Sequence, residues 1–192
     1  MRKMKWILMA VVMIPLLSSC GYNTMVELDE NVTASWAQVE NVYQRRADLV
    51  PNLVNTVKGY AAHEQETLQG VVEARSKATS INLSADELNE QTLQNFQKAQ
   101  EGLTSALSRL MVVMERYPDL KANQNFMDLQ AQLEGTENRI AVERRNFNEA
   151  TRAYNTYIRR FPRNLIAGMF NFESKPYFEA DAGASEVPEV QF

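Results

Sequence analysis

The sequence is poor in residues that break helices and in residues that carry most protein chemistry. It has seven glycines and six prolines among 192 residues, and only Pro51 and Pro118 interrupt the stretch from 25 to 161. Long helices are therefore free to form there. The chain has one cysteine, Cys20, and one histidine, His63. A single cysteine excludes an internal disulfide, and a single histidine excludes the di-iron site of helical bundles, which needs a Glu-x-x-His motif on two helices.

Other signatures of catalysis and cofactor binding are missing as well. The chain has no Gly-rich phosphate loop, no Gly-x-Ser-x-Gly turn, no covalent haem motif and no constellation of Ser, His and Asp. We therefore expect no enzymatic activity and no bound metal or cofactor. A haem held by a methionine and His63 is the one cofactor alternative, although Met111, Met114 and Met127 are more simply interpreted as core residues.

The chain also lacks an excess of basic residues. It has 20 lysines and arginines against 24 acids, and loss of the first 19 residues would leave 17 against 24, a formal charge of about −7. This acidity argues against nucleic-acid binding, which needs clustered basic side chains, and against electrostatic adhesion to anionic lipid. Attachment to a membrane must therefore come from another feature.

No apolar run is long enough to cross a membrane. The longest run, Trp6–Leu17, has 12 residues and contains Pro15, whereas a spanning helix needs about 20 apolar residues. Basic residues precede the run, and its size is typical of a signal peptide. An uncleaved anchor is the alternative, but the run is short for that role.

The run leads into a lipobox-like sequence at residues 17–20, Leu-Ser-Ser-Cys. We expect a cleaved signal peptide over 1–19, a lipidated linker over 20–24, and two or three acyl chains carried at Cys20, which is enough for stable membrane attachment. Gly21 follows the cysteine in place of the aspartate that retains lipoproteins in the inner membrane. In a bacterium with two membranes, this favours the outer membrane.

Apolar residues recur at alternating intervals of three and four in the second half of the chain. One seam runs from Phe126 to Phe161 with Thr136 and Glu143 as polar members, and it predicts a helix over 123–161 with Asn123 as its N-cap. A second seam predicts a helix over 84–117, which begins at a capping box that is formed by Ser84 and Glu87. Two long helices joined by a few residues pack antiparallel.

The first half of the chain carries two shorter apolar stripes with Pro51 between them. We expect the chain to break near Ala47, with helices over 25–46 and 48–79 and Asp48 capping the second. A single helix that kinks at Pro51 is the alternative. Trp36, in the first stripe, is expected in the core. The fold class is therefore all-α, an antiparallel four-helix bundle over 25–170.

Charged residues fall on or near the predicted seams. We expect a buried or half-buried ionic network where the first, second and fourth helices meet, because a charge in a seam is costly unless it is paired. The alternative is that these residues lie on solvated flanks. The predicted network consists of Arg46, Asp48, Glu137, Glu143 and Arg144.

The C-terminal segment, 171–192, differs in composition from the helical body. It contains aromatic residues among acids and becomes small and acidic from Ala180, a composition that predicts disorder. The aromatic residues either fold back over the end of the bundle or form a docking peptide that ends in a free carboxylate. The candidate docking residues are Phe172, Tyr177, Phe178 and Phe192.

Several ordered blocks of this sequence resemble the LemA family, over about Tyr22 to Phe178. The blocks are Gly21–Asn23, Arg45–Val54, Val57–Ala61 with His63 and Glu64, Glu115–Asn123, Thr136–Ile140, Arg145–Asn148, Tyr154–Asn155 and Phe161–Pro162. The resemblance implies an antiparallel four-helix bundle and no established activity. Family members typically begin with an uncleaved membrane helix, and this chain departs from that pattern at Pro15 and Cys20.

We take a lipid-anchored interaction protein of the bacterial cell envelope as the first functional hypothesis. The helical rod would hold a surface or the tail at a fixed distance from the membrane, where an envelope protein docks; self-association through the seams is left open. The second hypothesis is a small-ligand or cofactor binder that uses a gap near Trp36, Tyr60 and His63. A hydrolase ranks third.

Overall fold

The computed structural model describes residues 2–179, and of residues 2–20 only the backbone. Every regular element in this part of the chain is helical, which confirms the all-α class. The elements are α1 (Arg2–Lys58), α2 (Gln65–Ser80), the 3₁₀ turn η1 (Ala85–Glu87), α3 (Glu90–Met114), α4 (Pro118–Lys121), α5 (Gln124–Arg159) and α6 (Arg163–Met169). Within the described residues, none of the helices carries an apolar stretch long enough to span a bilayer.

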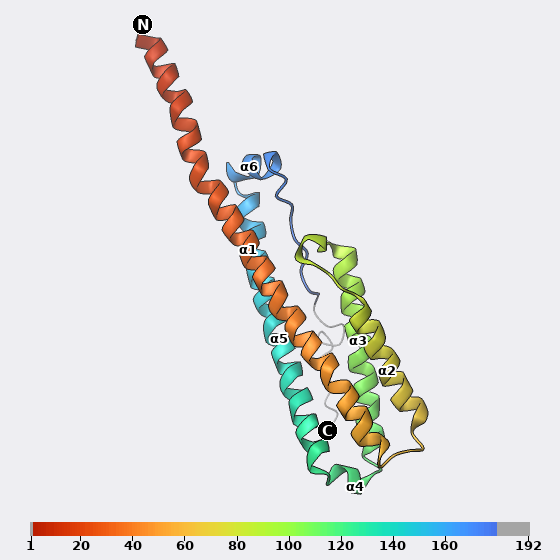
Figure 1. Ribbon diagram of the computed structural model, residues 1–192. Coiled ribbons are helices and arrows are strands. Elements are labelled where there is room, and N and C mark those ends of the chain that lie inside the picture. The colour runs from red at the N-terminus through yellow and green to blue at the C-terminus, as the bar shows by residue number, and fades with distance from the viewer. Residues whose placement is uncertain (1, 180–192) are drawn as a thin grey trace, which may run out of the picture.

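The long helices pack in two pairs (Figure 1). α1 lies along α5, α2 lies along α3, and α1 also contacts α2. Successive long helices run in opposite directions, as short connections require. The short helices close the two ends: α4 lies at one end, and α6 lies at the other, beside the part of α1 that continues to residue 2.

The break expected near Ala47 was wrong, because α1 continues through Pro51 to Lys58. The turn before α2 falls at residues 59–64, inside the helix predicted over 48–79. Proline has no N–H to donate to the carbonyl four residues earlier, which is that of Ala47. Arg75 of α2 supplies a donor, with its Nε 2.7 Å from the Ala47 oxygen. The carbonyl is thus satisfied from outside the helix, and Asp48 lies inside α1 and not at a cap.

The local start signals of the later helices are confirmed with one shift. Asn123 caps α5 by accepting from the Phe126 N–H at 3.1 Å. The Ser84 N–H donates to Glu87 at 3.1 Å, but this box opens η1, and α3 begins only after Asn89, whose side chain accepts from the Thr92 N–H. The predicted start at residue 84 was therefore several residues early.

The end of the α5 seam was also misplaced. Phe161 was expected in the core but is 81% exposed, because α5 ends at Arg159. A straight α-helix drifts by about 20° per heptad from a strict seven-residue repeat. Beyond Phe147 the core-facing residues are accordingly Thr151, Tyr154 and Ile158, and the predicted members Ala150 and Tyr157 are only partly buried.

The core divides along the rod into an aromatic half, towards α6, and an aliphatic half, towards α4. Trp36 is 1% exposed, which confirms its core placement, and its indole N–H donates to the Leu83 carbonyl at 2.7 Å. The ring lies 5.3 Å from Phe96 and 5.5 Å from Phe147, centroid to centroid. The half towards α4 is mainly aliphatic: it includes Val50, Leu53, Leu103, Leu110 and Met114, together with Phe126.

Candidate interaction groove between α3 and α5

A buried arginine joins three helices in the middle of the rod. Arg46 of α1 is 1% exposed. Its Nη1 donates to Thr104 Oγ1 at 2.7 Å and to Glu137 Oε1 at 2.6 Å, and its Nη2 donates to Gln100 Oε1 at 2.8 Å. The guanidinium also lies over the Tyr43 ring, 5.2 Å from its centroid. A single planar group therefore spaces α3 and α5 against α1.

The bonds described for the other members of the predicted ionic network go to other groups. Asp48 is exposed and accepts from Gln44 of its own helix at 2.8 Å. Glu143 is half-buried and accepts from Asn146, also of its own helix, at 3.0 Å. Arg144 donates to the Glu179 carbonyl at 2.8 Å. The structure thus brings Arg46 and Glu137 together, and the remaining partners of Arg46 are neutral residues that the charge pattern did not point to.

An extended segment follows α6 and lies along α5 (Figure 1). We call residues 172–179 the C-terminal strap. Two asparagines of α5 hold its backbone. Asn155 donates to the Lys175 carbonyl at 2.8 Å and accepts from the Lys175 N–H at 2.9 Å. Asn148 does the same to Phe178, at 3.1 and 2.9 Å.

The spacing of the two asparagines matches the geometry of α5 and of the extended strap. We call each asparagine with its two backbone bonds a clamp. Asn148 and Asn155 are seven residues apart on α5 and project from the same face. Seven helical residues rise about 10.5 Å, and the three residues from Lys175 to Phe178 span about 10 Å in an extended chain. The amide side chains therefore fall opposite every third strap residue. Each asparagine bonds only main-chain atoms of the strap, so these bonds do not depend on which side chains the strap carries.

An aromatic side chain anchors the strap in the core. Phe178 is 5% exposed; its ring lies 6.0 Å from Trp36 and 5.5 Å from Phe147, and the Arg144 guanidinium covers it at 5.0 Å. Phe172 is half-buried, with its ring 5.8 Å from Tyr22.

These two rings fold back over the body and are not exposed docking residues in this structure. Tyr177 is 45% exposed, and Phe192 lies outside the described residues, as does the segment from Ala180.

A carboxylate lies near a buried phenol beside the strap. Tyr154 of α5 is 1% exposed, and burial, with the negative charges of Asp29 and Glu173, raises its pKa to about 12. Lys175 pairs with Asp29 at 3.2 Å, which ties the strap to α1 as well as to α5.

Glu179, the last strap residue that the structure describes, lies at the mouth of a pocket between α3 and α5. The Glu179 carbonyl accepts from Arg144 at 2.8 Å and from Gln97 at 3.4 Å. Beyond it lies a pocket of 320 Å³. Its lining is rich in amide, hydroxyl and charged groups: Tyr43, Arg46, Gln97, Gln100, Glu101, Thr104, Ser105, Glu137, Ile140 and Arg144. We call the strap's channel together with this pocket the α3–α5 groove.

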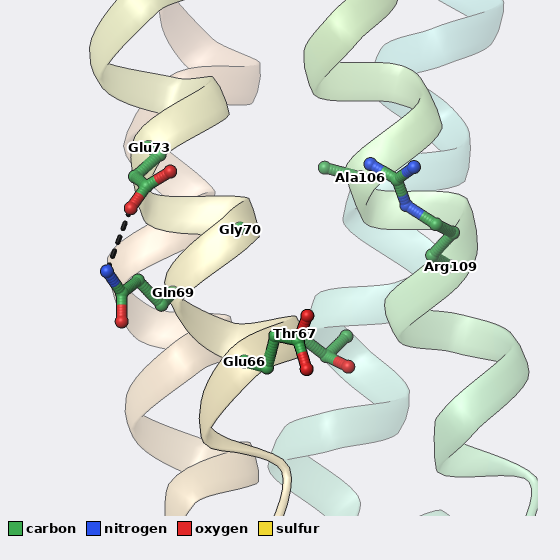
Figure 2. Close-up of a pocket in the computed structure, with 7 residues that line it drawn as sticks. All are labelled: Glu66, Thr67, Gln69, Gly70, Glu73, Ala106 and Arg109. Atoms are coloured by element: carbon green, nitrogen blue, oxygen red, sulfur yellow. Dashed lines mark hydrogen bonds between the residues drawn. The ribbon is translucent and has the colours of Figure 1, made fainter.

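A second hollow lies between α2 and α3 (Figure 2). It measures 530 Å³. Two of its lining residues, Gly70 and Ala106, are small and fill little of it. The bond described among its lining residues, Gln69 to Glu73 at 2.8 Å, stays within α2. Arg109 lies along α3 (Figure 2), so no set of groups converges on one point in this hollow.

The residues of the predicted ligand site are not neighbours. Trp36 and Tyr60 are separated by 24 residues, about 36 Å along a helix. Tyr60 is 46% exposed and accepts from Asn123 at 2.8 Å, and His63 is exposed. This placement contradicts a ligand gap shared by the three residues. In the described part of the chain, no three His, Cys, Asp or Glu side chains are grouped to hold a metal ion.

The asparagine clamps were missed from the sequence because an asparagine on a polar helix face looks solvated. Their spacing of one heptad is the signal that was available. Gln97 and Gln100 were missed for the same reason, although both are buried.

Comparisons with known proteins place the chain among bacterial relatives. The model of the LemA family matches residues 35–192. The magnetosome protein MamQ 2 of Paramagnetospirillum magneticum is 29% identical over 184 residues, which cover 87% of this chain and 67% of the relative. MamQ of Magnetospirillum gryphiswaldense is 27% identical, over 86% and 68% of the two chains. Protein LemA of Metamycoplasma hominis is 24% identical, over 88% and 71%.

Proposed function

The chain belongs to the LemA family, and from that premise we propose that it is a membrane-tethered interaction module of the cell envelope. In this proposal α1, α2, α3 and α5 form an antiparallel four-helix bundle, and the α3–α5 groove takes up an extended polypeptide segment. The observation that carries the proposal is the strap itself. Asn148 and Asn155 already hold an extended backbone in the groove by main-chain bonds alone.

The partner's segment enters the groove beyond the strap. Displacing the strap would expose Phe178 and the rings around it, which opposes release. The pocket past Glu179 instead offers amide, hydroxyl and guanidinium groups, and Arg144 and Gln97 already bond one backbone carbonyl at its mouth. Because these groups recognise main-chain atoms, we assign the pocket a partner peptide in extended conformation. The module binds and does not catalyse.

Tethering is assigned to Cys20. The apolar run and the Leu-Ser-Ser-Cys sequence support a cleaved signal peptide and an acylated cysteine, and Gly21 supports sorting to the outer membrane where there are two membranes. The relatives from Paramagnetospirillum magneticum and Magnetospirillum gryphiswaldense are named as magnetosome proteins. Mass spectrometry of the purified chain tests the tether: we expect residue 20 at the N-terminus with acyl chains, and Cys20→Ser should abolish both the processing and the lipid.

Site-specific photo-cross-linking in living cells tests the groove. A photoreactive amino acid replaces Ser105, which lines the pocket, and as a control Ser108, which is exposed on the same helix outside it. We expect one discrete cross-linked envelope protein from position 105 and none from position 108. The product should disappear in Arg144→Ala and Gln97→Ala chains, because those side chains bond the backbone at the mouth of the pocket.

The cross-linked peptide identifies the occupant. Attachment of position 105 to residues 180–192 of the same chain would mean that the protein fills its own pocket, and it would refute docking of a partner there. Attachment to a second, differently tagged copy would replace the envelope partner with self-association. Equal products from positions 105 and 108 would show that the groove has no special role.

A further inference from the structure

The end of the rod that carries α6 exposes large apolar side chains. We call Phe161, Leu165, Met169 and Phe170 the α6 face. Phe161 is 81% and Met169 78% exposed, and Leu165 and Phe170 are also exposed. The first three are spaced four residues apart. A soluble protein surface seldom gathers so many large apolar side chains in one short segment, and such patches mark contact surfaces.

The segment that contains α6 is rich in arginine in an otherwise acidic protein. Residues 150–172 contain four arginines and no aspartate or glutamate, while the whole chain has a formal charge of −4. Arg159 and Arg160 are exposed, and the Arg163 guanidinium lies 4.1 Å from the centre of the Tyr157 ring. Arginines beside exposed Phe, Leu and Met are typical of segments that lie in a bilayer interface, where basic side chains are attracted to the anionic surface. The acidity of the chain as a whole therefore does not describe this segment.

The α6 face lies directly beside the attachment point of the proposed tether. A β-carbon added to Gly21 would lie 3.9 Å from the Ile166 side chain, so α6 packs on α1 one residue after Cys20. The Tyr22 ring lies 4.9 Å from Phe170, and Met25 is fully buried. No spacer separates the tether from the folded body, so a lipid-bearing Cys20 brings α6 within a few ångströms of the bilayer surface.

We propose that the α6 face is seated in the headgroup region of the bilayer and that Arg159 and Arg160 contact anionic lipid phosphates. This inference rests on the proposed tether and adds a second, protein-borne contact to it. The contact sets the orientation of the rod: a tether at one residue allows any tilt, whereas a tether plus the α6 face holds α4 and the far end of the groove away from the membrane.

Lipid-borne quenching of a single dye tests this contact. Cys20 is the only cysteine, and acylation blocks its thiol, so Met169→Cys provides a unique labelling site. Val112→Cys is the matched control, because Val112 is 72% exposed and lies in the last turn of α3, at the end of the rod that carries α4. The full chain is reconstituted into vesicles of phosphatidylethanolamine and phosphatidylglycerol, with or without brominated lipid. In vesicles with brominated lipid we expect the dye at position 169 to be quenched severalfold more strongly than the dye at position 112. Its emission should also shift to the blue, whereas that of the dye at position 112 should not. Arg159→Glu with Arg160→Glu should weaken the quenching.

The outcomes separate the inference from the tether. A chain that floats with the vesicles but is quenched equally weakly at positions 169 and 112 keeps the tether and refutes the α6 contact. A chain that fails to float refutes both. A blue shift at position 169 without vesicles, together with a dimer in sedimentation, would mean that a second copy covers the α6 face. A free thiol at Cys20 in mass spectrometry would refute acylation but not the α6 contact. In that case the dye quenching at positions 169 and 112 is measured in a Cys20→Ser chain that keeps residues 2–19.

Discussion

At the scale of single residues, Arg46 shows how one buried charge is accommodated. It is bonded to one carboxylate and to neutral acceptors on α3, while the Glu137 side chain is 42% exposed. The charge is therefore only partly compensated by a partner that water also reaches. A buried ion pair of this kind is weak evidence for stability, but removal of one partner is costly because the other charge stays buried.

This asymmetry predicts a non-additive double substitution. Glu137→Ala should lower the free energy of unfolding by about 3 kcal/mol, because the Arg46 guanidinium stays buried without a counter-charge. The double variant Glu137→Ala with Arg46→Met should have a free energy of unfolding that is little lower than that of Glu137→Ala, or higher, since no buried charge remains. Urea unfolding of the two single variants and the double variant measures this. Simple addition of the two single costs would contradict the explanation.

Tyr154 predicts a specific loss of stability in alkali. Its pKa is raised from 10.0 to about 12 by burial and by the charges of Asp29 and Glu173. The folded chain therefore holds this proton at pH values where the unfolded chain has lost it. The resulting stability is fully present below pH 10 and is lost as the pH rises from 10 to about 12. The unfolding midpoint of the wild type should fall more steeply over this range than that of Tyr154→Phe; parallel curves would refute the assignment.

At the scale of elements, the continuity of α1 depends on a contact from another helix. Pro51 leaves the Ala47 carbonyl without its helical donor, and Arg75 of α2 takes that place at 2.7 Å. The Arg75–Ala47 hydrogen bond therefore replaces the missing helical bond and also forms part of the α1–α2 interface.

A double-mutant cycle tests the repair. Arg75→Met should cost about 1.5–3 kcal/mol, the range for a hydrogen bond to a charged group. In a Pro51→Ala background it should cost clearly less, because the N–H of residue 51 then donates to Ala47. Pro51 is exposed, so its own replacement disturbs no packing. Equal costs of Arg75→Met in the two backgrounds, measured by urea unfolding, would mean that the bond does not replace the missing helical donor.

The strap is held at separate points that can be probed one at a time. Asn155→Ala should speed amide hydrogen exchange at Lys175, and Asn148→Ala should do so at Phe178, because each substitution removes the acceptor of that amide. Asn138→Ala is the control, since Asn138 is exposed on the same helix. Exchange at Lys175 and Phe178 that is unchanged in all three variants would show that the asparagines do not hold the strap.

At the scale of the whole molecule, the two helix pairs build a rod with different ends. From Gly21 to Lys58, α1 alone rises about 57 Å. One end carries α6, exposed apolar residues and arginines, and the other carries α4. The groove runs along the side between them. This asymmetry suits the proposed tethered module, because it would separate the end assigned to the membrane from the groove assigned to a partner.

The elongation predicts a scattering result. Residues 20–192 of a compact globular protein would have a radius of gyration of about 16 Å, and a rod about 57 Å long should exceed this clearly. Small-angle scattering of a soluble Cys20→Ser chain lacking residues 1–19 measures this radius, and the forward intensity gives the mass. A monomer with a radius of 16 Å or less would contradict the rod.

Much of the helical body followed from local signals. The caps at Asn123 and at Ser84, the core position of Trp36 and the all-helical class depend on residues within a turn or two of one another. Of the strap and the candidate groove, the sequence had singled out Arg46, Glu137, Arg144, Phe172, Tyr177 and Phe178, but not their neutral partners. The neutral partners Gln100, Asn148 and Asn155 are as common on solvated helix faces as in buried sites, so composition does not distinguish the two.

The sequence by itself determined that the chain is helical, where α5 begins and which faces are apolar, because these depend on periodicity and on hydrogen bonds between near neighbours. Only the tertiary structure decided that α1 runs through Pro51, that α5 turns its asparagines towards a strap and that α6 packs beside Gly21. Each of these depends on a donor, acceptor or side chain that lies 20 or more residues away in the chain. A local sequence pattern does not show whether a group distant in the chain will hydrogen-bond to a given carbonyl, because only tertiary packing brings the two together.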